Sequence, residues 1–286
     1  MNDPHRMIAL CSLEVSRRVS AASRWLSSLL VFFATASALA QTPPTVFLDD
    51  LTWPELKEQI RSGKTTIIVP IGGTEQNGPH MVLGKHNVRA KALSEKIAMA
   101  LGDALVAPVI AYVPEGRLNP PTAHLRFPGT ITIPAETFQT VLEYAARSFK
   151  LHGFRDIVFL GDHGGYQSDV KLVADKLNRE WAGSPVRVHA VPEYYGVTQA
   201  AYTQALEDRG YRGEEIGTHA GLADTSLMLA IDPTSVRVDA LRKGAKPSSG
   251  DGVYGDPRRA SADLGQLGVD VIVTRTVEAI RKRTHR

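Results

Sequence analysis

Residues 66–71 read Thr-Ile-Ile-Val-Pro-Ile and run directly into the polar segment 72–80, which reads Gly-Gly-Thr-Glu-Gln-Asn-Gly-Pro-His. A short, β-branched apolar run of this kind is typical of a strand buried in a parallel sheet. Open α/β sheets bind their ligands just beyond the carboxyl ends of the strands. Because Glu75 follows this strand closely, we expect it to lie at a ligand site.

A second apolar run, residues 156–160, reads Asp-Ile-Val-Phe-Leu and is followed by Gly-Asp-His-Gly-Gly. His163 therefore follows this strand as Glu75 follows the first. Because parallel strands end at the same edge of a sheet, we expect both side chains to converge on one pocket. Asp162 is a candidate for orienting a histidine ring, although side chains of adjacent residues often diverge.

The rest of the chain alternates between predicted helices and strands. We expect a helix that starts after an N-capping Thr52, helices at 87–101, 135–152 and 168–181, near 197–208 and 222–231, and near 257–281, and strands at 104–107 and 186–191. This alternation predicts an α/β fold with a mostly parallel sheet and helices on both faces. Two long loops, 114–121 and 244–255, are either binding loops or simple connectors.

The first forty residues have the order of a secretory signal peptide. Basic residues precede the apolar run 25–34, and Ala38-Leu39-Ala40 closes the segment. The apolar run is shorter than the roughly 18 residues of a spanning helix. We therefore expect a signal peptide at 1–40, a domain at 41–286, and export to a bacterial periplasm with no membrane contact after cleavage. An uncleaved anchor and a start at Met7 are the alternatives.

Composition narrows the function. The leader holds four arginines and two acidic residues, so its removal lowers the formal charge from +3 to +1. Such a domain gives no electrostatic reason to expect nucleic acid as a partner. The single cysteine, Cys11, lies in the leader, so the domain has neither disulfides nor thiolate metal ligands. Nucleotide-binding and serine-hydrolase motifs are absent from the sequence. Any metal must therefore be held by oxygen atoms and imidazoles.

Four ordered motifs between residues 46 and 270 resemble those of the creatininase family of metal-dependent amidohydrolases. They are the segments 75–86, 127–130, 161–165 and 219–226, of which the last reads His-Ala-Gly-Leu-Ala-Asp-Thr-Ser. The resemblance implies a three-layer α/β/α fold, a homo-oligomer and a centre of two metal ions. The family's first motif supplies a glutamate, a histidine two residues later and an aspartate eleven residues after the glutamate. Those positions here are Glu75, Asn77 and His86.

The resemblance and the ligand chemistry together predict a metal site made of Glu75, His86 and His163. Two imidazoles and one carboxylate suit zinc, with manganese or iron as alternatives, and leave positions open for water and substrate. A water bound to such an ion can have a pKa near 7 and supply hydroxide. A second ion has less support, because Asn77 offers only a neutral amide and Gly165 carries no side chain.

Further polar residues complete the candidate site. The resemblance places His219 near the substrate, where it could donate a proton to a leaving nitrogen or orient the carbonyl. Asp224 is a candidate metal ligand, a partner that holds a ligand histidine, or a plain helix acid. His124 is either a substrate contact or a loop-packing residue. Asn77 and His80 are candidate substrate contacts; for His80 a structural role is favoured, and replacement of the histidine missing at position 77 is a further alternative.

These patterns predict a hydrolase that cleaves a C–N amide bond of a small molecule, linear or cyclic, with Glu75 and His219 as catalytic residues. The altered ligands argue against creatinine as the substrate. The alternative is a non-catalytic exported protein that binds a ligand or a metal on a degenerate creatininase scaffold. Retention of Glu75, His163 and His219 favours the enzyme, whereas the changes at 77, 86 and 222 favour the binding protein.

Overall fold

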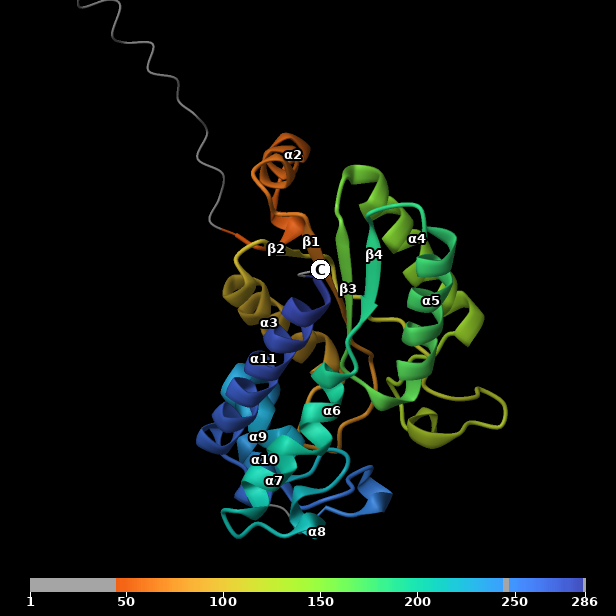
Figure 1. Cartoon of the computed structure of the whole chain (residues 1–286). Coiled ribbons are helices and arrows are strands. Elements are labelled where there is room, and N and C mark those ends of the chain that lie inside the picture. The colour runs from red at the N-terminus through yellow and green to blue at the C-terminus, as the bar shows by residue number, and fades with distance from the viewer. Residues whose placement is uncertain (1–44, 244–246, 285–286) are drawn as a thin grey trace, which may run out of the picture. The chain divides into compact units, whose positions relative to one another are not determined.

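The computed structural model describes residues 45–243 and 247–284 (Figure 1). Within these residues, four strands form one sheet in the order β2-β1-β3-β4. They are β1 (Thr66–Ile71), β2 (Ala104–Val106), β3 (Asp156–Gly161) and β4 (Arg187–Ala190). All neighbouring strands are parallel, and β1 pairs with β3 along its whole length, so that Ile71 lies beside Gly161. The carboxyl ends of β1 and β3 therefore lie side by side.

Helices connect and flank the strands. The longer ones are α2 (Trp53–Arg61), α3 (Lys85–Leu101), α4 (Ala135–His152), α5 (Gln167–Glu180), α9 (Leu222–Ile231) and α11 (Ala262–Thr284), and the shorter ones are α6 (Glu193–Gln199), α7 (Ala201–Glu207), α8 (Gly213–Ile216) and α10 (Val238–Lys243). Thr52 stands at the N-cap of α2 as predicted, and its backbone N–H and hydroxyl both donate to the Glu55 carboxylate in the first turn. The predicted leader lies outside the described residues.

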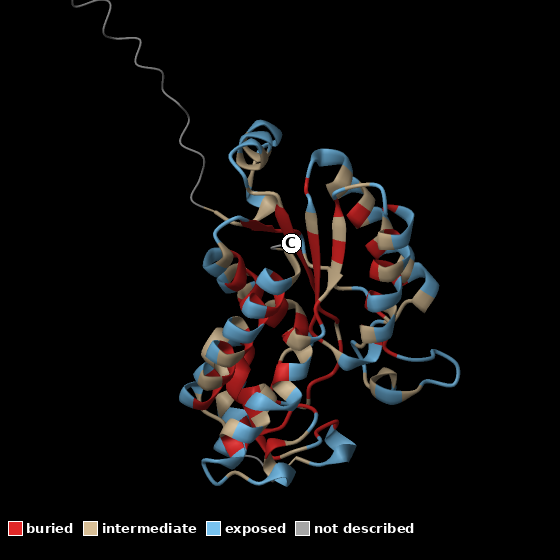
Figure 2. Ribbon diagram, in the orientation of Figure 1, coloured by how far each residue is buried: buried red, intermediate tan, exposed pale blue. Residues whose placement is uncertain are grey.

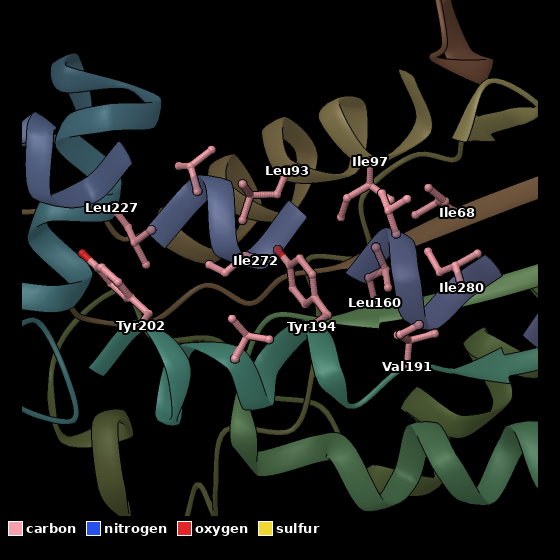
Figure 3. Packing of buried hydrophobic residues seen from close by; sticks show 14 of the residues in the cluster. Ile68, Leu93, Ile97, Leu160, Val191, Tyr194, Tyr202, Leu227, Ile272 and Ile280 are labelled. Atoms are coloured by element: carbon pink, nitrogen blue, oxygen red, sulfur yellow. The ribbon is translucent and has the colours of Figure 1, made fainter. Parts of the chain in front are cut away.

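Alternate residues of β1 enter two separate hydrophobic clusters. Ile68 belongs to a cluster with Leu93 of α3 and Ile272 of α11 (Figure 3). Ile67 belongs to a cluster on the other face, which includes Phe138 of α4. Figure 1 shows α3 and α11 on one side of the sheet and α4 and α5 on the other. Both faces of the strand are thus covered, which explains its continuous apolar sequence.

Burial follows the same three layers. Figure 2 shows buried residues along the strands and on the inward faces of the helices, with exposed residues on the outer faces. The predicted three-layer α/β/α fold with a parallel sheet is therefore confirmed. No helix in the described parts of the chain combines the length and apolar character needed to cross a membrane.

Helix α3 begins at Lys85, two residues before the predicted start. Gly84 stands at its N-cap, and the backbone carbonyl of Gly84 accepts the first helical hydrogen bond, from Val88. Residues three and four apart share one helix face. The earlier start therefore places Lys85 on the same face as Arg89, with His86 beside them in the first turn.

The predicted helical regions 197–208 and 257–281 also differ from the structure. The region 197–208 contains two helices, because Ala200 has the non-helical angles φ −125° and ψ −84° and separates α6 from α7. The last helix begins at 262 instead of 257. A short 3-10 turn, Pro257–Arg259, precedes it, and its first residues are capped by the side chain of Asp256.

Candidate metal centre

The candidate site lies where β1 and β3 end. Glu75 belongs to the segment that follows β1, and His163 follows β3 almost directly. His86 comes from the first turn of α3, which that same segment leads into. The fold thus brings His163 together with Glu75 and His86, which belong to a segment far from it in the sequence.

Glu75, His86 and His163 form one group that could hold a metal ion, because each offers a ligand atom within 4.8 Å of the others. Glu75 Oε1 lies 2.7 Å from Nε2 of His86. The rings of His86 and His163 meet edge to face, with centroids 5.3 Å apart. The ligand set predicted from sequence is therefore assembled in space.

The second carboxylate oxygen of Glu75 shows that this group suits a cation. Oε2 is buried and has no hydrogen-bond partner among the described residues. His124 Nε2 approaches it to 3.5 Å, which is too long for a good hydrogen bond. A buried carboxylate oxygen without a partner is costly. A divalent ion held by this carboxylate and the two imidazoles would remove that cost.

The ionisation states also suit a metal site. Burial alone would raise the pKa of Glu75, but the hydrogen bond and charge of His86, followed by the charge of Lys85, hold it far below its ordinary value. Burial, followed by the charge of His86, lowers the pKa of His163 to about 4. Glu75 is therefore ionised and His163 neutral at pH 7, which are the forms that bind metal.

Asp162 holds His86 instead of its sequence neighbour His163. Its Oδ2 lies 2.7 Å from His86 Nδ1, and the same carboxylate accepts hydrogen bonds of 2.8 Å from Arg89 and Tyr194. A carboxylate behind a ligand histidine fixes the ring and makes it a better donor. Asp162 therefore orients a histidine, as the sequence suggested, and directs His86 Nε2 towards Glu75.

A second group, Glu75, His124 and His219, has ligand atoms equally close together. The two histidine rings stack with centroids 4.1 Å apart. His219 Nε2–H donates to the backbone carbonyl of Gln76 at 2.9 Å, so its Nδ1 keeps a lone pair, 3.6 Å from Glu75 Oε1. Burial, followed by the charge of Lys85, lowers the pKa of His219 to about 3. His219 is therefore a neutral proton acceptor at pH 7 and can donate a proton only after taking one up.

Asp224 lies in an ion-paired cluster outside both groups. Its Oδ2 accepts hydrogen bonds of 3.0 Å from Lys85 Nζ and from the Ala220 N–H, and its Oδ1 accepts one of 2.7 Å from Arg89. Arg89 also binds Asp162, the carboxylate that holds His86. Among the three roles left open by the sequence, this geometry matches a partner that supports a ligand histidine, here through Arg89.

Asn77 and His80 shape the segment that carries Glu75. The Asn77 amide nitrogen donates to the backbone carbonyls of Glu75 and Val82, at 2.9 and 3.0 Å. His80 Nε2 lies 3.0 Å from the hydroxyl of Thr225. Both side chains are buried, and neither lines the cavity described below. Their geometry is therefore structural, as favoured for His80, and differs from the substrate contact considered for Asn77.

A cavity of about 340 Å³ adjoins the two groups. Its walls include imidazole, ammonium and phenol groups from His86, His124, His163, His219, Lys85 and Tyr195. The volume is in the range of small-molecule sites. Because His124 and His219 face this space, both remain available to a substrate.

Three ionisable residues of the site were not predicted from the sequence. Lys85 and Arg89 are four residues apart, but the predicted helix start at residue 87 left Lys85 outside the helix. The two were therefore not recognised as neighbours on one helix face. Glu115 comes from the loop 114–121 and is buried, with Oε1 unpaired and 3.8 Å from His163 Nδ1. Burial, followed by the charge of Glu75, raises the pKa of Glu115 to about 8. This carboxyl is therefore protonated at pH 7.

Several known proteins are similar to this chain in both sequence and fold. The profile of the creatininase family, described as creatinine amidohydrolase, matches residues 49–280. The creatinine amidohydrolase of Pseudomonas putida is 27% identical over 257 residues, which cover 83% of this chain and 97% of that protein. A mycofactocin precursor peptide peptidase of Mycobacterium tuberculosis is 28% identical over 233 residues, which cover 73% of this chain and 81% of that protein.

A solved structure of a mutant creatininase of the Zn–Zn type has a TM-score of 0.68 at 27% identity, over 85% of this chain and 99% of that one. The family match includes both strand ends and all the residues of the candidate site. These agreements in sequence, fold and site position show that the chain belongs to the creatininase family.

Proposed function

We propose that this protein is a metal-dependent hydrolase that cleaves a C–N amide bond of a small molecule. The observation that carries the proposal is the buried, unpaired Oε2 of Glu75 in a group with His86 and His163. The names of both relatives, an amidohydrolase and a peptidase, describe hydrolysis of amide bonds. The cavity of about 340 Å³ favours a small molecule over a long peptide.

In this proposal, Glu75, His86 and His163 hold a divalent ion, with zinc or manganese as the first candidates. When bound, the ion would polarise the substrate carbonyl and lower the pKa of a water molecule. Asp162 keeps the His86 ring in place from behind. His219 Nδ1, which carries no proton, accepts one from the attacking water and passes it to the leaving nitrogen.

The test is hydrolysis of a panel of small linear and cyclic amides by protein loaded with zinc or manganese. We expect wild type to hydrolyse at least one of them, and His163→Ala to lose metal and to lose activity on the order of 100-fold or more. His152→Ala, which removes an exposed histidine of α4, is the matched control and should keep both the bound metal and the activity. Hydrolysis that survives both chelation and His163→Ala would contradict the proposal.

A binding protein is the second candidate, and one observation favours it. Asn77, at the position of a family ligand, points its amide nitrogen at backbone carbonyls and offers no imidazole. A protein of this kind would bind metal and small amides without turnover. Product analysis after long incubation with a bound ligand separates the two candidates.

We also propose that the protein works after export and as a homo-oligomer. The signal-peptide pattern of residues 1–40 supports export, and the family resemblance supports the oligomer. Cell fractionation and the mass of the purified protein in solution test these two points independently of the activity.

A further inference from the structure

Lys85 carries its charge into the interior of the site. Its side chain is 1% exposed, and Nζ lies 3.0 Å from Asp224 Oδ2 and 3.7 Å from Glu75 Oε1. A buried ammonium is costly unless carboxylates pair with it. Two carboxylates do so here, one from α9 and one from the segment after β1. Lys85 therefore places a cation beside the same Glu75 oxygen that faces His86.

The charges of the described site groups leave room for one divalent ion. Three carboxylates, Glu75, Asp162 and Asp224, face the two cations Lys85 and Arg89. Counting these five side chains alone, the formal charge is −1. One divalent ion would change it to +1 and two would change it to +3. Like charges repel strongly in a buried site, so the second ion would bind against that repulsion.

The carboxylate donors for a second ion are also occupied or missing, and Asn77 Oδ1, which has no partner among the described residues, offers only a neutral amide oxygen. Both oxygens of Asp224 accept from cations. Two residues near the site motifs supply no donor, since Leu222 is buried and apolar and Gly165 has no side chain. His219 Nδ1 remains, but the Glu75 oxygen that it faces is the one beside Lys85.

We propose that the ammonium of Lys85 is the permanent second cation of this site, so that the chain binds one divalent ion where a relative of the Zn–Zn type has two. This inference rests on the proposed metal-dependent function. It predicts that Lys85→Ala binds more metal than wild type. Removing the ammonium leaves Glu75 Oε1 and Asp224 Oδ2 without their shared cation, and His219 Nδ1 lies 3.6 Å from that Glu75 oxygen, so a second ion can take the place of the ammonium.

The test is the number of ions per chain, measured without any substrate. Wild type, Lys85→Ala and Lys85→Arg are equilibrated with Mn²⁺ and freed of unbound metal. Elemental analysis gives the content, and electron paramagnetic resonance distinguishes an isolated Mn²⁺ from a coupled pair. Lys171→Ala is the matched control, because Lys171 is an exposed lysine of α5 paired with Asp175 on its own helix.

We expect about one ion per chain and an isolated-ion spectrum for wild type, Lys85→Arg and Lys171→Ala, and about two ions with a coupled spectrum for Lys85→Ala. Lys85→Gln replaces Lys85→Ala if the latter does not fold, as judged by circular dichroism, and the expectation is the same. Two ions in wild type, or one ion in the folded neutral variant, would overturn the inference and leave the hydrolase proposal standing. No bound ion in any variant would overturn both.

Discussion

Glu115 offers a test of the site's electrostatics that needs no substrate. Its side chain is buried, and its Oε1 has no partner among the described residues. Burial, followed by the charge of Glu75, raises its pKa from 4.5 to about 8. The substitution Glu115→Gln keeps the size and polarity of the side chain but removes its ionisation. The variant therefore isolates the free-energy cost of charging this position.

The raised pKa of Glu115 determines how the stability of the protein changes with pH. Because the folded protein binds this proton more tightly than the unfolded chain, wild type loses stability as pH rises from 4.5 to about 8. Each pH unit costs about 1.4 kcal/mol, so the penalty at pH 7 is about 3 kcal/mol. We therefore expect metal-free Glu115→Gln to exceed wild type in stability by up to about 3 kcal/mol at pH 7, and by almost nothing near pH 4.5.

The assay is urea unfolding of metal-free wild type and variant at several pH values between about 5 and 8. The free-energy difference between the two should grow with pH by about 1.4 kcal/mol per unit. Glu207→Gln, which changes an exposed glutamate of α7, is the control and should show no such slope. A difference that stays constant with pH would refute the reasoning. Added zinc should reduce the slope, because a nearby cation lowers the pKa of a carboxyl group.

Three further substitutions test the site and the core. His86→Ala should lower zinc affinity by about 100-fold or more, measured by calorimetry, whereas His152→Ala should leave it unchanged. Gly217→Ala should destabilise the protein by several kcal/mol in urea unfolding, on the order of 2–4, because Gly217 has φ +70° and a Cβ there would overlap the backbone at 254–255. Leu160→Ala should cost about 2–5 kcal/mol in the same assay, because Leu160 is fully buried and its removal leaves a cavity. A cost below about 1 kcal/mol for either would contradict the packing described.

Most of the fold could be predicted because its signals are local. A strand covered on both faces must be apolar throughout, and this pattern predicted β1 with its observed bounds. The apolar face of 135–152 did the same for α4, and the bounds expected for α9 also match. The start of α3 was misplaced because its first residues, Lys85 and His86, are polar and serve the site. A polar first turn is indistinguishable from a loop in the sequence.

The sequence by itself determined the fold class, through its alternating helices and strands. It also determined the family resemblance and the candidate ligand set of Glu75, His86 and His163, because short motifs carry both. Only the tertiary structure decided the partners of these residues. Asp162 meets His86 across 76 positions, and Lys85 meets Asp224 across 139. Such pairings depend on which strands are neighbours and how helices pack against them, and local spacing does not encode that. The ion pairs of Lys85 and Arg89, on which the proposed ion count rests, therefore became visible only in the folded chain.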